Sequence, residues 1–174
     1  MLLVIGAEDR IIAGTDTVIS DPFLSSAIPQ AISIGNWQTP NVETILSLKP
    51  DVIIAYESYK PKNLDQLLSA DIPIVHLDCY QLKTLESDAR ALGNLTGKQE
   101  EAEEYISFIG ERLEKVSSRL SATDRTEWPR VYFESYSDFT TSGAGSAADN
   151  LLNASGGVSI AGDSPMQSIK VNPE

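Results

Sequence analysis

The sequence predicts an α/β protein with one parallel-sheet lobe, a long connecting helix and the start of a second α/β lobe. Three features predict this class. Short β-branched runs alternate with helical patterns in the first half, residues 98–120 form one long amphipathic pattern, and a new strand and helix follow residue 125. We therefore expect an amino-terminal lobe at residues 1–97, a rigid connecting helix at 98–122, and an incomplete carboxy-terminal lobe at 125–174.

A capped helix that leads into a buried strand is the clearest local pattern of the first lobe. Asn41 can accept backbone N–H groups as an N-cap, and Glu43 places a carboxylate in the first turn, where the helix dipole favours it. Lys49-Pro50 ends the helix, because the residue before a proline is pushed out of the α region. The unbroken apolar run from Val52 to Ala55 predicts a strand that is covered on both faces of a parallel sheet.

The remaining elements follow from periodicity and from turn residues. In the first half we expect a helix end at residues 1–5, strands at 11–14, 31–34 and 72–77, and helices at 21–28, 64–68 and 82–95. In the second half we expect a strand at 130–134 and a helix at 146–154. The long helix should bury one apolar stripe, formed by Ala102, Tyr105, Ile106, Ile109, Leu113, Val116 and Leu120. A parallel sheet needs a strand before the first helix, so we expect either a truncated chain or an atypical amino terminus.

Composition excludes some classes of function. The formal charge is −12, which argues against a nucleic-acid partner, because such a partner needs a basic surface. An acidic solubilising surface is the ordinary explanation, and a partner with basic loops is the alternative. The single Cys79 cannot form an intramolecular disulfide. No apolar run approaches the ~20 residues that span a bilayer, and residues 1–5 lack the basic flank of a secretion signal.

Several short motifs follow one another in a particular order along nearly the whole chain, although none is specific alone. They are Leu3–Gly14, Gly35-x-Trp37, Asn41-x-Glu43-x-Ile45, Leu48–Ile54, the long helix, Thr141–Gly143, and Leu151-Leu152 leading to Gly156-Gly157-x-x-Ile160-Ala161. In this order and spacing the chain resembles the substrate-binding proteins of ABC importers that carry iron–siderophore complexes, haem or cobalamin.

The resemblance implies two α/β lobes, each a three-layer, Rossmann-like sheet structure, joined by one rigid helix with the ligand held in the cleft between them. It implies a periplasmic or extracellular location, with lipid anchoring of a longer parent chain as an option, and neither a cofactor nor catalysis. A glutamate on each lobe docks to arginines of the membrane permease in such proteins. Glu43 matches the first of these and Glu174 resembles the second. Without the resemblance, Glu43 would be read as an ordinary surface residue.

The resemblance also marks candidate ligand contacts in the cleft. Large aromatic rings offer much contact area at little entropy cost, which suits a bulky chelate or macrocycle. The first candidates are Trp37, Tyr56 and Phe139, and the lower-ranked ones are Tyr59, Tyr136, Ser142 and Gly143. Taken alone, each aromatic is more often a packing residue. We expect a ferric siderophore as the ligand, with cobalamin or haem as the alternative; Trp37-Gln-x-x-Asn-x-Glu favours cobalamin.

Other patterns carry less weight. Gly143-Ala-Gly145-Ser-Ala-Ala148 has the form of a dinucleotide fingerprint, which leaves a nucleotide-binding enzyme as the rival class. The polar residues 135–142 separate it from the preceding strand, whereas the fingerprint follows its strand directly. His76 is the only histidine, which argues against a zinc or manganese site built from several histidines and carboxylates. Ser146 lacks the G-x-S-x-G elbow, so a Ser-His-Asp triad is not expected. The glutamates of the long helix are read as its solvated face.

Overall fold

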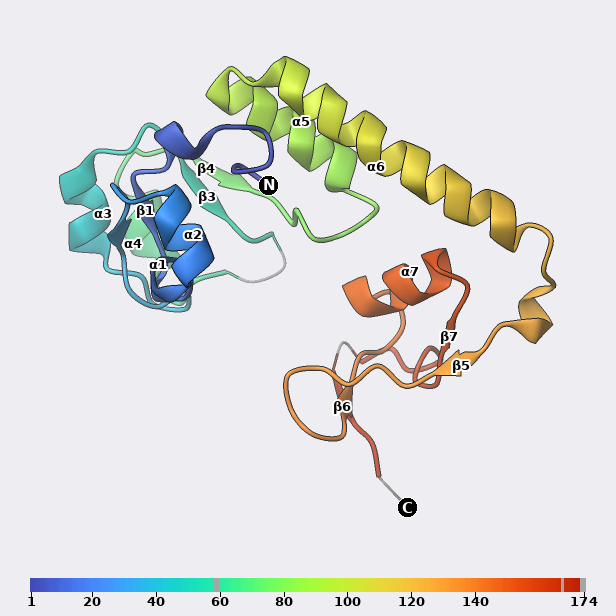
Figure 1. Ribbon diagram of the computed structural model, residues 1–174. Coiled ribbons are helices and arrows are strands. Elements are labelled where there is room, and N and C mark those ends of the chain that lie inside the picture. Colours follow the sequence, from blue (N-terminus) through green and yellow to red (C-terminus); the bar gives the residue numbers. More distant parts are fainter. Residues whose placement is uncertain (58–59, 167, 173–174) are drawn as a thin grey trace. The chain divides into compact units, whose positions relative to one another are not determined.

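The computed structural model describes residues 1–57, 60–166 and 168–172, and the chain divides into two compact units (Figure 1). Unit 1 comprises Met1–Cys79 and Ser87–Tyr105, and unit 2 comprises Tyr80–Glu86 and Ile106–Glu174. Each unit contains both helices and paired strands, as expected for an α/β chain.

Unit 1 contains two pairs of parallel strands. β1 (Ala13–Gly14) pairs with β2 (Ile32–Ser33), and β3 (Ile53–Ala55) pairs with β4 (Ile74–His76). The first connection holds α1 (Asp16–Ser20) and α2 (Pro22–Ala27), and the later ones hold α3 (Val42–Leu48) and α4 (Leu64–Leu68). A short 3-10 helix, η1 (Glu8–Arg10), precedes β1. The expected strands and helices are therefore present, most of them shorter than predicted, and α1 was not predicted.

Three local predictions in unit 1 are confirmed. The Asn41 side chain accepts the backbone N–H of Thr44 at 3.0 Å and so caps α3. Lys49 ends that helix in the left-handed conformation, with a φ of 50°. The expected helix end at residues 1–5 is one helical turn, closed by a bond of 2.9 Å from Ala7 N–H to the Leu2 carbonyl, and Gly6 beside it has a φ of 66°.

The core of unit 1 joins its first turn, the end of β4 and two helices, α5 (Leu85–Thr96) and the start of α6 (Gln99–Leu120). Its buried members are Ile5, Ala7, Leu77, Leu92 and Ala102. α5 and α6 lie side by side (Figure 1), and the Arg90 guanidinium contacts Glu103 at 2.6 Å across them. A Cβ on Gly93 would lie 2.8 Å from that of Ala102, so the close approach of these helices requires glycine there.

Unit 2 pairs β5 (Arg130–Val131) with β7 (Val158–Ser159) in parallel and β6 (Thr140–Thr141) with β8 (Ile169–Lys170) in antiparallel orientation. The 3-10 helix η2 (Arg125–Glu127) comes before β5, and helix α7 (Ala147–Ala154) precedes β7. Ser146 Oγ accepts the Asp149 N–H at 3.1 Å, while the buried Asp149 carboxylate accepts the Gly145 N–H at 2.9 Å. These bonds fix the start of α7 at the predicted place.

Two burial predictions are wrong. Ile54 is 41% exposed, so β3 is not covered on both faces. Its neighbours Ile53 and Ala55 point to the opposite face, because side chains alternate along a strand. The apolar stripe of α6 is buried at Ala102 and Ile106, but Leu113 and Val116 are each 38% exposed. Periodicity identifies an apolar face without specifying how much of it another element covers.

We expect Leu92→Ala to lower the free energy of unfolding of unit 1 by about 2–5 kcal/mol, because Leu92 is 2% exposed in the core cluster and its truncation leaves a cavity. Leu95→Ala is the matched control on the same helix, since Leu95 is 45% exposed. Urea denaturation followed by circular dichroism measures both variants. Equal losses in the two variants would show that this core is wrongly assigned.

Candidate functional site

Trp37 lies in the connection from β2 to α3, and hydrogen bonds close this connection at its base. The Gly35 carbonyl accepts the Asp16 N–H at 2.9 Å, and the Ile34 carbonyl accepts the Asn41 N–H at 2.8 Å. Trp37 itself is 37% exposed. The sequence therefore places a large, partly exposed ring on an anchored loop at the carboxyl end of a parallel strand, where ligands bind in many α/β proteins.

Tyr56 follows β3 directly, and residues of β4 and its extension hold the backbone around it. His76 Nδ1 lies 3.1 Å from the Tyr56 carbonyl oxygen, and the buried Asp78 carboxylate accepts the Glu57 N–H at 3.2 Å. The Tyr56 side chain is 50% exposed. The parallel pairing of β3 with β4 thus presents a second aromatic residue, and hydrogen bonds hold its own carbonyl and the N–H that follows it.

Two hydrogen bonds join the loops that follow β2 and β3. The Lys62 N–H donates to the Gln38 carbonyl at 2.8 Å, and Asn63 Nδ2 donates to the Pro40 carbonyl at the same distance of 2.8 Å. The loop of Trp37 and the connection after Tyr56 therefore lie together within unit 1. Tyr59, the third aromatic predicted for this unit, lies outside the described residues.

In unit 2 the segment between β5 and β6 carries Tyr136 and Phe139, and its chain turns back on itself. The Ser135 N–H donates to the Thr140 carbonyl at 2.8 Å, and the Thr140 N–H donates to the Ser137 carbonyl at 3.0 Å. Tyr136 is 84% exposed, and its hydroxyl lies 3.4 Å from Ser168 Oγ. Phe139 is 43% exposed. Unit 2 therefore also presents two aromatic side chains on one closed loop.

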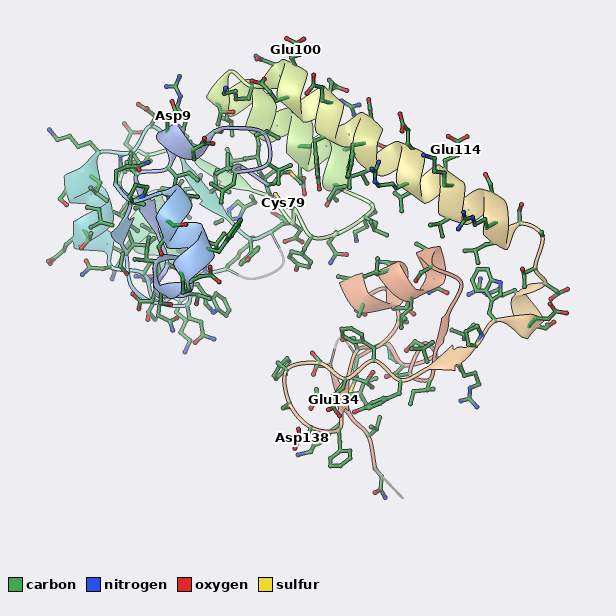
Figure 2. The ribbon with its side chains drawn as sticks, viewed as in Figure 1. Asp9, Cys79, Glu100, Glu114, Glu134 and Asp138 are labelled. Atoms are coloured by element: carbon green, nitrogen blue, oxygen red, sulfur yellow. The ribbon has the colours of Figure 1, made fainter. Side chains whose placement is uncertain are left out.

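The Glu134 carboxylate stands at the start of this loop, and Figure 2 labels it together with Asp138 on the bend. One oxygen of the Glu134 carboxylate, Oε2, accepts hydrogen bonds from the Tyr132 hydroxyl at 2.7 Å and from the Phe139 N–H at 3.0 Å. The same bonds lower the pKa of Glu134, because they favour the ionised carboxylate. The bond to Glu134 raises the pKa of Tyr132 to about 12, so this phenol remains a neutral donor at pH 7.

Gly143 and Ser142 were predicted as cleft residues of lower rank, and the surroundings of Gly143 also give it a packing role. Gly143 is buried, and a Cβ there would lie 2.1 Å from the Met166 carbonyl oxygen and 2.6 Å from that of Ser164. The neighbouring Ala144 N–H donates to the Ser164 carbonyl at 2.8 Å. Ser142 is partly buried next to it. The backbone at Gly143 therefore packs directly against the backbone of Ser164 and Met166, and this contact is possible because glycine has no side chain.

Glu43 is exposed in the first turn of α3, as predicted, and Glu174 lies outside the described residues. Unit 1 thus holds Trp37, Tyr56 and Glu43, while unit 2 holds Tyr136, Phe139, Ser142 and Gly143.

Sequence reasoning missed that polar side chains hold the aromatic loops, namely those of Asn63, His76, Asp78 and Glu134. For Glu134 a signal was available, because Tyr132 and Glu134 are two residues apart in an extended segment and so share a face.

Within residues 1–57, 60–166 and 168–172, no group of three or more His, Cys, Asp or Glu side chains is placed to hold a metal ion. In the same part of the chain, no helix has the length and apolar character needed to cross a membrane. The geometry offers exposed aromatic rings and hydrogen-bonding groups, which suit the binding of a large ligand.

The chain belongs to the family of periplasmic binding proteins, which it matches over residues 1–174. It is 29% identical over 164 residues to the vitamin B12-binding protein of Photorhabdus laumondii, across 91% of this chain and 58% of that protein. It is 31% identical over 146 residues to the vitamin B12-binding protein of Pectobacterium carotovorum, across 81% of this chain and 51% of that protein. The chain therefore spans about half the length of these curated relatives.

Solved structures confirm the predicted α/β fold with parallel strands. The periplasmic vitamin B12-binding protein of Vibrio cholerae has a TM-score of 0.79 at 22% identity, across 99% of this chain and 66% of that one. The molybdate-binding protein of Haemophilus influenzae has a TM-score of 0.81 at 16% identity, across 98% of this chain and 60% of that one. The family consists of binding proteins, which confirms the prediction that the chain is not an enzyme.

We expect Gly143→Ala to lower the free energy of unfolding of unit 2 by at least ~1–3 kcal/mol, because the new methyl group overlaps two backbone carbonyl oxygens that cannot rotate away. Ser142→Ala serves as the control, since it changes the adjacent side chain without adding an atom near Met166. Thermal unfolding of both variants provides the measurement. A Gly143→Ala variant as stable as the wild type would contradict the packing role of this glycine.

Proposed function

We propose that the chain is the ligand-capturing part of an ABC importer's substrate-binding protein and that its ligand is cobalamin or a related corrinoid. The observation that carries this proposal is the similarity to vitamin B12-binding proteins over 91% of the chain, at 29% identity. It favours the alternative drawn from the Trp37-Gln-x-x-Asn-x-Glu motif over the ferric siderophore expected first. Haem and ferric siderophores therefore become the competing ligands in the test.

The chemistry of the exposed aromatics agrees with such a ligand. A corrin ring is broad and largely apolar on its faces, so flat side chains can cover it at little cost in conformational entropy. Trp37 and Tyr56 are 37% and 50% exposed on loops that are joined by hydrogen bonds. We propose these two as ligand contacts from unit 1, with Tyr59 as a further candidate. Tyr136, Phe139, Ser142 and Gly143 are proposed as contacts from unit 2.

Docking to a permease is the second part of the proposal. Glu43 is exposed at the start of α3, where it is free to meet a basic partner, and the formal charge of −12 favours encounter with such a partner. Glu174 is proposed as the corresponding residue of the carboxy-terminal lobe. The proposed location is the periplasmic or extracellular face of the membrane that carries the permease. In this proposal residues 1–97, 98–122 and 125–174 keep the roles of lobe, connecting helix and partial second lobe.

We expect Trp37→Ala to weaken the binding of cyanocobalamin by about 5–30-fold, because it removes a large aromatic contact of the kind that dominates binding energies. Phe23→Ala is the matched control, since Phe23 is an aromatic residue of the same unit that is 77% exposed on α2. Isothermal titration calorimetry of the whole chain measures the affinities, with haemin and a ferric hydroxamate siderophore titrated in parallel.

The titration also tests the ligand class. Preferential binding of haemin or of the siderophore would replace cobalamin as the proposed ligand. If none of the three compounds binds the wild-type chain, the proposal that this chain captures a metal chelate is wrong.

We expect Glu43→Lys to weaken binding to the solubilised permease by about tenfold or more, because it replaces an attractive charge at a docking surface with a repulsive one. Cobalamin affinity should not change. Asp65→Lys is the matched control, because Asp65 is also an exposed carboxylate in the first turn of a helix, α4. Biolayer interferometry with immobilised permease measures docking. Equal weakening by both substitutions would indicate a general charge effect and contradict a specific role for Glu43.

A further inference from the structure

The loop between β5 and β6 holds Phe139 in an unusual backbone conformation. Phe139 has a φ of 57°, in the left-handed region that a bulky residue rarely occupies. Such a conformation persists only where the surrounding bonds determine it. The Phe139 carbonyl accepts the Val171 N–H at 2.7 Å, which fixes the residue on its carboxyl side. The bond that fixes its amino side is the one to Glu134.

Glu134 is suited to this task by position and by charge. Its Oε2 receives the Phe139 N–H at 3.0 Å and the Tyr132 hydroxyl at 2.7 Å, so Tyr132 orients the same oxygen that holds the loop. Hydrogen bonds to an ionised acceptor are stronger than those between neutral groups. Asp138 lies on the bend of the same loop, whereas Glu134 lies at its start (Figure 2). The two carboxylates of this loop therefore occupy different places.

We propose that Glu134 is a positioning residue for ligand binding, which holds the backbone of Phe139 so that its ring is presented to the ligand. This inference rests on the proposed function in one respect, namely that Phe139 contacts the ligand. Its structural part, that Glu134 orders the backbone at Phe139, stands independently. Tyr132 supports the arrangement through its hydroxyl group without contacting the Phe139 N–H.

The structural part is tested in the ligand-free chain by amide hydrogen exchange at Phe139. We expect Glu134→Ala to speed this exchange by about three- to tenfold, because the N–H loses its acceptor. Glu134→Gln should retain most of the protection, since its amide oxygen can occupy the place of Oε2. Asp138→Ala is the control and should leave the protection factor at Phe139 unchanged, once the exchange rate is corrected for the different preceding side chain. Unchanged exchange in Glu134→Ala would overturn the proposal whether or not any ligand binds.

The functional part is tested by a double-mutant cycle with cyanocobalamin, using the wild type, Glu134→Ala, Phe139→Ala and the double variant. We expect Glu134→Ala alone to weaken binding by about three- to tenfold and to have little further effect when Phe139 is already alanine. Glu134→Gln should restore binding to near the wild-type level, which a general structural defect would not explain. Independent, multiplicative effects of the two substitutions would overturn the role of Glu134 through Phe139.

The two failures are distinguishable. Absence of cobalamin binding by the wild type would contradict the proposed function, while the exchange measurement would still decide whether Glu134 positions Phe139. Wild-type binding with an unaffected Glu134→Ala variant would contradict the positioning role alone.

Discussion

Loops that carry exposed aromatic side chains need their backbone groups held, because an aromatic ring that faces solvent contributes little packing to its own loop. In this chain polar side chains hold them. His76 contacts the Tyr56 carbonyl, Asn63 donates to the Pro40 carbonyl, and Glu134 accepts the Phe139 N–H. Each of these bonds joins a backbone group of an aromatic-bearing loop to a side chain from another position in the chain. Side-chain hydrogen bonds therefore contribute to holding the backbone of each loop that presents a ring.

The sequence allowed the helix starts to be predicted well, because caps are local. Asn41 and Ser146 both accept a backbone N–H three residues ahead, as their side-chain chemistry requires. The burial of Ile54 and Val116 was predicted wrongly, because the extent to which a face is covered is a tertiary property. A helix shows the same apolar pattern whether other elements cover it along its whole length or along only part of it.

The candidate site could be predicted only in part, because some of its contacts follow from local pattern and strand pairing and others are tertiary. Trp37 and Tyr56 follow strands that the sequence identifies, so their places on strand-end loops could be deduced from parallel pairing. The link between Glu134 and Phe139 could not be deduced, because it depends on a positive φ at a bulky residue. No propensity favours phenylalanine in that conformation. The bonds that produce it come from Glu134 and from Val171, which is 32 positions further along the chain than Phe139.

One residue connects the two proposed roles of unit 1. The Asn41 N–H donates to the Ile34 carbonyl at 2.8 Å and closes the loop that carries Trp37, while its side chain caps α3 at 3.0 Å and so fixes the turn that carries Glu43. The backbone N–H of Asn41 thus holds the loop of a proposed ligand contact, and its side chain holds the helical turn of a proposed docking carboxylate.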